Sequence, residues 1–257
     1  MKKIFYFVAL VAISLLFVQC EQQPCTCTPC PCVDGTCTCS GDNNGNGSGD
    51  SNTGNTDTKD EGTGVEAGHA YVDLGLPSGL KWATCNIGAT VSTDFGDYFA
   101  WGEVEPKKDY SWETYKYGTE DNLTKYNSSD GKIVLDAEDD VATVNWGGKW
   151  RMPTKEEMEE LVDNCTSLYT SKTDENGYAV FGWKVTGPNG NSIFLPAEGC
   201  IYKGTLLEAG SCAYYWSSSL YIDNSSSAYY LGINEHGMGV TWDYSRHYGL
   251  SVRPVCK

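Results

Sequence analysis

Short stretches in the second half of the chain alternate apolar with polar residues, which is the period expected of half-buried β-strands. We predict strands at 70–74, 80–84, 97–101, 178–185, 192–195, 213–217, 228–233, 238–242 and 250–255. Turn residues separate several of them, at 77–79, 187–190 and 235–237. Many strands beside few helices predict an α+β fold of mainly antiparallel strands, not a wound parallel sheet.

One segment has the spacing of an amphipathic helix instead. Its apolar residues recur three and four apart, at Met158, Leu161, Val162 and Cys165. Thr154 can cap this helix, and Glu157 completes a capping box with it, so we predict a helix over 155–164. We predict a second helix over about 137–145 and a short third one near 111–117.

The first residues have the pattern of an export signal. Lys2 and Lys3 precede an apolar run over 4–18, which is shorter than the roughly 20 residues that span a bilayer. Cys20 follows directly, as at the acylation site of a bacterial lipoprotein. The alternative is an ordinary secretory signal, because Gln19 stands where lipoprotein signals usually carry a small residue. We predict a signal peptide over 1–19, lipidation of Cys20, and a surface-exposed location on the outer membrane.

The composition of residues 20–66 predicts a disordered tether. Val33 and Val65 are the only aliphatic residues larger than Ala between 21 and 66, and 42–64 is a Gly/Asn/Ser-rich linker. Cysteines cluster in this tether at Cys25, Cys27, Cys30, Cys32, Cys37 and Cys39. Disulfides are the default for such a tract in an exported protein, and a thiolate metal cluster is the alternative. The run from Asp42 resembles half a calcium loop, but Thr53 replaces its bidentate Glu, so we predict no metal there.

Charge and motifs narrow the classes of function. The formal net charge of −16 argues against nucleic acid and anionic membrane surfaces as partners. The chain lacks a Gly-x-Ser-x-Gly elbow and a phosphate-binding glycine loop, and its three histidines are scattered at positions typical of surfaces and turns. We therefore predict no catalytic activity and no cofactor.

Six motifs in a fixed order carry a resemblance to a known family. They start at Tyr71, Gly96, Asn145, Phe194, Tyr215 and Val252, and they include Trp-Arg-Met-Pro-Thr, Tyr-Trp-Ser-Ser-Ser and the Val-Arg-Pro-Val-Cys ending. The region 67–257 resembles the Fibrobacter major paralogous domain family. It is also similar to the C-terminal domain of Legionella collagen-like adhesins and, more distantly, to formylglycine-generating enzymes. The resemblance implies a C-type-lectin-like fold and no defined activity. The enzymes act through two close cysteines near their end, where this chain has Cys256 alone.

The family pattern also bears on the cysteines of the domain. Cys200 and Cys212 stand where the resemblance implies aromatic residues, and they flank a loop that contains Gly204 and Gly210. Because both positions have changed to cysteine together, we predict a disulfide between them. The pairing of Cys85, Cys165 and Cys256 stays open.

Lectin-like folds usually bind ligands on their long loops, here 197–213, 219–227 and 243–249. Stacking rings and hydrogen-bonding groups gather near the end of the chain, at Trp242, Asp243, Tyr244, Arg246, His247 and Tyr248. The alternative is that Trp242 faces the core. Calcium-dependent lectins carry an acidic-or-amide-Pro-Asn motif and a Trp-Asn-Asp motif. The segments 187–189 and Trp242-Asp243 each lack one residue of these motifs. We predict an adhesin-like surface lipoprotein that recognises an extracellular glycan or protein. The alternatives are a structural surface protein without a ligand and, less favoured, an enzyme of the formylglycine-generating type.

Lipidation gives the first testable prediction. We expect mass spectrometry of the membrane fraction to find Cys20 as an acylated mature N-terminus, because it follows the apolar run directly. Replacing Cys20 by Ser should release the protein from the membrane fraction. A free mature N-terminus at any other residue would contradict the lipoprotein assignment.

Overall fold

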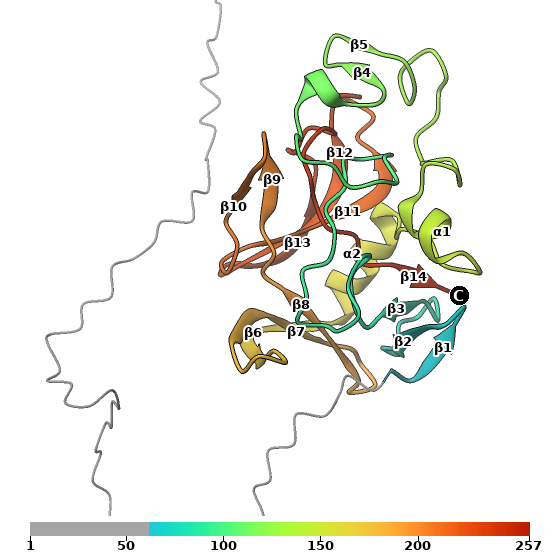
Figure 1. Cartoon of the computed structure of the whole chain (residues 1–257). Helices are drawn as coiled ribbons and strands as arrows, with labels where there is room; N and C mark the ends of the chain where they lie inside the picture. Colours follow the sequence, from blue (N-terminus) through green and yellow to red (C-terminus); the bar gives the residue numbers. More distant parts are fainter. Residues whose placement is uncertain (1–61) are drawn as a thin grey trace, which may run out of the picture. The chain divides into compact units, whose positions relative to one another are not determined.

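The computed structural model describes residues 62–257, in which short antiparallel strands dominate (Figure 1). Two α-helices and one 3-10 turn accompany the strands: α1 (Val141–Trp146), α2 (Lys155–Asn164) and η1 (Trp112–Thr114). This confirms the predicted α+β class with mainly antiparallel pairing. No helix within 62–257 has the length and apolar character needed to cross a membrane.

One sheet joins the two ends of the folded region. Its order is β1 (Gly64–Glu66), β2 (His69–Asp73), β3 (Lys81–Ala83) and β14 (Val255–Cys256). The first of these strands lies inside the segment that we assigned to the tether, and Thr63 N donates to Tyr71 O at 2.6 Å. The folded domain therefore starts before residue 67. The rest of the predicted tether and Cys20 lie outside the described residues.

Two further sheets have three strands each. One runs β6 (Thr166–Thr173), β7 (Ala179–Thr186), β8 (Ser192–Pro196), and the other runs β11 (Ala213–Leu220), β12 (Ala228–Asn234), β13 (Gly237–Thr241). Two small hairpins are β4 (Gly118–Thr119) with β5 (Asn122–Leu123) and β9 (Cys200–Tyr202) with β10 (Thr205–Leu207). The turns predicted at 187–190 and 235–237 connect β7 to β8 and β12 to β13.

Helix α2 matches its sequence pattern. Glu157 N donates to Thr154 Oγ1 at 3.4 Å, and Thr154 N donates to the Glu157 carboxylate at 2.9 Å, so the predicted capping box is present. Arg151 adds an ion pair to Glu157 at 2.5 Å. Met158 and Leu161 are fully buried and pack the helix on β11, β12 and β13, where Figure 1 shows it.

Two predicted strands do not form as continuous elements. Segments 97–101 and 250–255 meet at one isolated bridge, in which Phe99 and Leu250 exchange backbone hydrogen bonds of 2.9 and 3.1 Å. The bridge is reinforced by a side chain, because Trp216 Nε1 also donates to Phe99 O at 2.9 Å. Conversely, β6 was not predicted, because its Thr- and Ser-rich sequence has no apolar alternation.

The ending of the chain is held by the buried guanidinium of Arg253. It donates to Asn86 Oδ1 at 2.7 Å and to the carbonyls of Ala83, Thr84 and Phe194 at 3.1, 3.2 and 3.0 Å. These acceptors lie far from Arg253 in the sequence, so one side chain ties the segment 83–86 and strand β8 to the end of the fold. The Arg-Pro motif of the ending is therefore structural.

We expect Arg253→Met to lower the free energy of unfolding by at least about 3 kcal/mol, because it leaves several buried acceptors without a donor. Urea denaturation measures this loss. The matched control is Lys184→Met on the exposed face of β7, which should stay within about 0.5 kcal/mol of the original protein. A loss below about 1 kcal/mol for Arg253→Met would show that water or neighbouring groups replace the guanidinium.

Candidate functional site

One exposed and two half-buried aromatic side chains cluster at one end of the β11–β12–β13 sheet; we call Tyr221, Tyr229 and Trp242 the aromatic platform. The Trp242 side chain is 46% exposed. It stacks on Tyr221 with ring centroids 5.3 Å apart and planes 25° apart, and Tyr229 meets it at 6.2 Å and 70°. Trp242 therefore does not face the core, which was the alternative interpretation of this residue.

Strand geometry explains why these rings gather. Tyr221 follows the end of β11, and Trp242 follows the end of β13, the other edge strand of the same sheet. Tyr229 lies in β12 between them, and its neighbour Tyr230 is buried. Because successive side chains in a strand point to opposite faces, Tyr229 points outward. Sequence reasoning missed Tyr221 and Tyr229, although this alternation is visible in the sequence.

The residue after Trp242 is an aspartate whose carboxylate is held in a fixed orientation. Asp243 is exposed, and its Oδ1 accepts hydrogen bonds from Tyr230 OH and from Thr241 Oγ1, the latter at 3.2 Å. On the other side, Lys155 Nζ lies 5.0 Å from the centre of the Tyr229 ring and pairs with Glu159 at 3.1 Å. The Asp243 carboxylate thus lies on the side of the sheet that bears Tyr230, whereas the platform on the side of Tyr229 presents ring faces.

Backbone hydrogen bonds connect the loop after β11, which begins at Tyr221, to the segment that follows Trp242. Tyr221 N donates to Ser227 O at 3.2 Å, which closes the loop after β11. Ser227 forms an isolated bridge with Ser245, and Arg246 N donates to Ser226 O at 2.9 Å. The structure therefore brings the predicted ligand loops 219–227 and 243–249 side by side.

Arg246 supports these loops from inside and cannot touch a ligand, so the prediction of a ligand contact was wrong for it. Its side chain is fully buried. It donates to Ser225 O at 3.0 Å, to Tyr115 OH at 2.9 Å and to Lys125 O at 3.2 Å. The guanidinium also lies 4.8 Å from the centre of the Trp101 ring. It is a positioning residue, because it holds the loop that bears Tyr221.

The other predicted ligand residues belong to an inner aromatic layer. His247 is 5% exposed, with its ring centroid 4.6 Å from that of Trp112, so it is not the surface histidine we predicted. Tyr248 is half-buried and stacks on Tyr202 at 4.7 Å. Tyr244 is half-buried too, and its hydroxyl accepts from the Cys200 thiol at 3.6 Å. Of the six predicted residues, only Trp242 and Asp243 are exposed.

The predicted Cys200–Cys212 disulfide is not present in the structure. Within 62–257 every cysteine is a thiol and no disulfide forms. A parallel bridge joins Gly199 to Ala213, and Gly199 N donates to Cys212 O at 2.9 Å. This register places Cys200 beside Tyr214 rather than beside Cys212, which explains why proximity in sequence does not bring the two sulfurs together.

Glu198 is a fully buried carboxyl beneath the same loops. Its Oε1 accepts from Tyr214 N at 2.9 Å, and its own carbonyl accepts from Tyr98 OH at 2.5 Å. Burial raises the pKa of this carboxyl to about 8, against the opposing effect of the backbone hydrogen bonds it accepts and of nearby Arg253. At neutral pH Glu198 therefore holds a proton in the folded protein.

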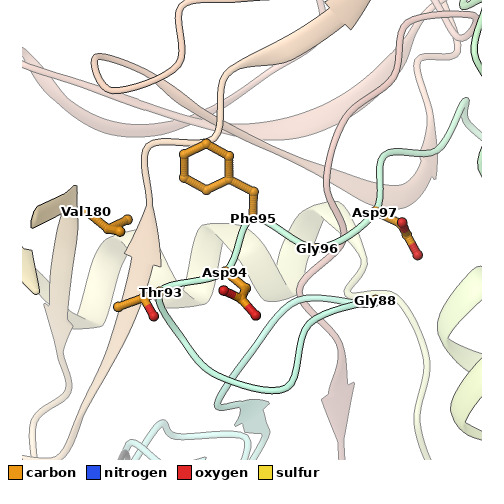
Figure 2. Close-up of a pocket in the computed structure, with 7 residues that line it drawn as sticks. All are labelled: Gly88, Thr93, Asp94, Phe95, Gly96, Asp97 and Val180. Atoms are coloured by element: carbon orange, nitrogen blue, oxygen red, sulfur yellow. The ribbon is translucent and has the colours of Figure 1, made fainter. Parts of the chain in front are cut away.

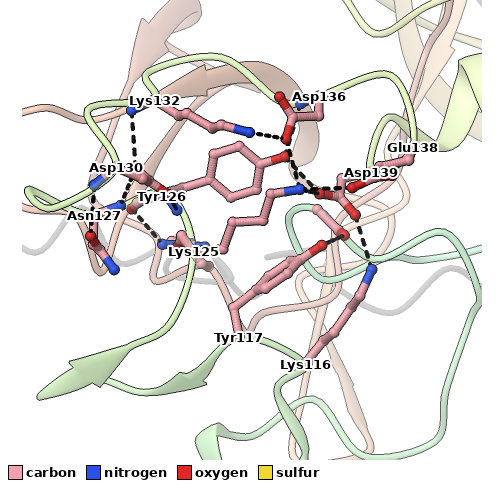
Figure 3. A network of polar contacts seen from close by, with 12 residues as sticks. Lys116, Tyr117, Lys125, Tyr126, Asn127, Asp130, Lys132, Asp136, Glu138 and Asp139 are labelled. Atoms are coloured by element: carbon pink, nitrogen blue, oxygen red, sulfur yellow. Dashed lines mark hydrogen bonds and ion pairs between the residues drawn. The ribbon is translucent and has the colours of Figure 1, made fainter.

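An acidic cluster elsewhere holds a lysine at its centre (Figure 3). Asp136, Glu138 and Asp139 lie close enough together to share a cation. However, Lys125 Nζ lies 2.7, 3.1 and 2.6 Å from their oxygens, and Lys116 pairs with Asp139 at 2.9 Å. Burial alone would raise the pKa of Asp139, but hydrogen bonds from Lys125 and its neighbours hold that pKa well below its ordinary range. Lys132 also pairs with Asp136, so three ammonium groups balance the three carboxylates and the cluster is a structural network.

A shallow hollow of about 420 Å³ lies on another face, where Figure 2 shows Asp94 and Asp97 among the residues that line it. The loop from Gly88 to Asp97 forms most of its wall, and Val180 of β7 completes it. The hollow therefore offers two exposed carboxylates without a cationic or thiol side chain among its lining residues.

The fold and the platform define an α+β domain that presents an aromatic surface on its loops. A family model for the Lcl C-terminal domain matches residues 75–256, which is more than half of the chain, so the chain belongs to this family. The match agrees with the resemblance to Legionella collagen-like adhesins, whereas it does not confirm the Fibrobacter family. No curated protein and no solved structure matches the chain.

Two buried groups predict how stability depends on pH. Glu198 has a pKa of about 8 in the folded state against an ordinary value of 4.5, so the folded protein binds an extra proton between these values. The free energy of unfolding then falls as pH rises, by at most about 1.4 kcal/mol per pH unit for one proton. Burial lowers the pKa of His247 from 6.5 to about 4, so its contribution is lost as pH falls from 6.5.

The two effects oppose each other from about pH 4.5 to 6.5, and above 6.5 Glu198 acts alone up to about pH 8. We therefore expect Glu198→Gln to remove a decline in stability between pH 6.5 and 8, measured by urea denaturation at each pH. Glu235→Gln at the exposed β12–β13 turn is the control and should keep the decline. An unchanged decline in Glu198→Gln would assign it to other groups.

Proposed function

We propose that this chain is an adhesin-like surface lipoprotein whose C-terminal domain recognises an extracellular glycan without catalysis. Membership of the Lcl C-terminal domain family supports a binding role. In this proposal the domain has a C-type-lectin-like fold, Cys20 carries the lipid that anchors the chain to the outer membrane, and residues 21–61 form the stalk. The observation that carries the proposal is the exposed aromatic platform.

The exposure of Trp242 is unusual for this domain. Four other tryptophans, at 82, 101, 150 and 216, are at most 1% exposed, so the fold has the capacity to bury such rings. Soluble proteins rarely leave large aromatic groups clustered in solvent unless they bind something there. Tyr221 and Tyr229 hold the Trp242 ring in place, which lowers the entropy cost of binding.

Sugars fit the chemistry of the platform. The C–H face of a pyranose ring is apolar and packs on aromatic rings, while its hydroxyls donate to carboxylates. Trp242 offers an exposed ring face for the first kind of contact. A protein partner is the other class of extracellular ligand predicted from the sequence, and a surface protein without any ligand is the rival interpretation.

An enzyme of the formylglycine-generating type has less support. Cys256 is 3% exposed, and burial raises the pKa of its thiol, which disfavours the reactive thiolate. Its backbone is also committed to β14, which pairs with β3. We propose a binding role and not this chemistry.

A mutation at the platform tests the proposal. We expect Trp242→Ala to weaken binding of the full chain on glycan arrays at least tenfold, because it removes the central ring. The matched control is Tyr178→Ala, which removes another aromatic ring that is 71% exposed, next to β7. Both variants should unfold at the same temperature as the original protein.

Three outcomes separate the interpretations. Equal binding by Trp242→Ala and the original protein would place the ligand elsewhere. Binding on protein arrays alone would favour a protein partner. Absence of binding on both kinds of array would favour the structural role.

A further inference from the structure

We propose that β6 pairs with β6 of a second copy of this chain, in antiparallel orientation about a two-fold axis at Thr170. Strand β6 is the outer strand of the sheet β6–β7–β8, and within 62–257 no further strand pairs with its other edge (Figure 1). It is eight residues long, lacks proline, and pairs with β7 over its whole length without a bulge. A regular edge of this kind is open to pairing with another chain.

The direction of the backbone groups decides which residues can pair outward. Asp174 N donates to Tyr178 O at 2.8 Å, so β6 bonds to β7 through every second residue that precedes Asp174. The residues between these turn their N–H and C=O groups to the outer edge. They are Ser167, which is half-buried, and the exposed Tyr169, Ser171 and Thr173.

These four edge residues are symmetric about Thr170. A two-fold axis at Thr170 sets Tyr169 opposite Ser171 of the second copy, and Ser167 opposite Thr173 of the second copy. Every outward N–H and C=O group of the four residues then has a partner. A shift of the register in either direction leaves an end residue opposite a position outside β6. The edge is therefore complementary to itself, which is what an isologous dimer requires.

Side chains on both faces of β6 fit this register. Tyr169 is 47% exposed and stacks on Phe181, which is 46% exposed, with ring centroids 5.9 Å apart. Because Ser171 lies opposite Phe181 in the β6–β7 pair, Tyr169 of one copy passes over a small side chain toward Phe181 of the other. On the opposite face Leu168, which is 65% exposed, packs on the aliphatic stem of Lys172 of the second copy. Pairing thus covers apolar groups that a single copy leaves in water.

Charge does not oppose this pairing, although the chain is acidic. Lys172 is the only charged residue within β6, and it lies opposite Leu168 in this register, so like charges do not face each other. The Lys172 ammonium lies over the neighbouring strands, where it donates to Ser92 Oγ at 3.3 Å and lies 5.4 Å from the centre of the Phe194 ring. A foreign strand would have to reproduce the ring and the serine gap, whereas a second copy supplies both.

The dimer has a consequence for binding that does not depend on the identity of the ligand. The platform residues Tyr221, Tyr229 and Trp242 lie outside the sheet that pairs. Each dimer therefore presents two platforms, and two linked sites hold a surface with repeated ligands more firmly than one site does.

A symmetric cross-link tests the register. In the dimer the two Thr170 residues form a non-hydrogen-bonded pair with α-carbons about 4.5 Å apart, which a disulfide can span. We expect Thr170→Cys in the exported full chain to form a disulfide between the two copies of position 170 on mild oxidation, located by mass spectrometry. The matched control is Leu168→Cys, because Leu168 lies on the same face and is more exposed. Its two copies are offset by about 13 Å along the strands, so we expect at least about tenfold less bridging.

The strength of pairing is measured without new cysteines. Sedimentation equilibrium of the full chain, in a density-matched detergent with a reductant that prevents disulfides between tethers, should show a dimer with a Kd below about 1 mM. Ser171→Pro should raise this Kd at least about tenfold, because it removes one outward N–H from each copy and leaves the bonds to β7 in place. Ser171→Ala keeps the N–H and should leave the Kd within about twofold.

The outcomes are independent of whether a glycan binds. A monomer at all concentrations up to about 1 mM would overturn the inference. Equal bridging by Thr170→Cys and Leu168→Cys would also overturn it, because random collision would then explain the cross-link. A dimer with an unchanged Kd in Ser171→Pro would place the interface elsewhere. If Ser171→Pro lowers the melting temperature as well, the comparison of the two cross-links decides.

Discussion

The structure depends on buried guanidinium groups that satisfy loop carbonyls. Arg246 and Arg253 are fully buried, and their hydrogen bonds go to neutral oxygens rather than to carboxylates. A domain of short strands has many backbone carbonyls that no sheet partner reaches, and each costs free energy if it is buried alone. Arginine carries five N–H donors on a rigid plane, so one side chain can serve carbonyls from several loops. Aromatic rings around Arg246 add cation–π contacts that offset its desolvation.

This arrangement links the core to the candidate site. Arg246 reaches Ser225 in the loop after β11 and donates to Tyr115 and Lys125 in the loops around β4 and β5. The loop that begins at Tyr221 is therefore held to the interior by hydrogen bonds, and this fixes the backbone beneath the aromatic platform. A site built this way is specific in its geometry, because the rings do not need to be ordered by the ligand.

Elements that are stabilised by neighbouring residues in the chain could be predicted from the sequence. The capping box of Thr154 and Glu157 and the apolar stripe of α2 lie within one segment, so the helix could be predicted with its ends. The β12–β13 hairpin was predicted too, since its turn and its alternation are contiguous. Strand β6 was not, because it is held by pairing with β7 and not by its own apolar residues. Arg246 was misjudged for the same reason: an arginine near tyrosines predicts a polar surface loop, and only the long-range fold encloses it.

Of the platform residues, the sequence pointed to Trp242 but not to Tyr221 and Tyr229. The dipeptide Tyr229-Tyr230 shows why. Tyr229 and Tyr230 are adjacent in β12, and the pleat of the strand sends them to opposite faces. Tyr229 contributes to the exposed platform, whereas Tyr230 donates from the core to the Asp243 carboxylate. A count of 17 tyrosines cannot separate these roles, but strand alternation can. Since one dipeptide supports both the platform and the carboxylate on the other face, a shift of β12 by one residue would exchange the two faces and remove both. The register of this central strand, held on one side by β11 and on the other by β13, is therefore the condition on which the candidate site exists.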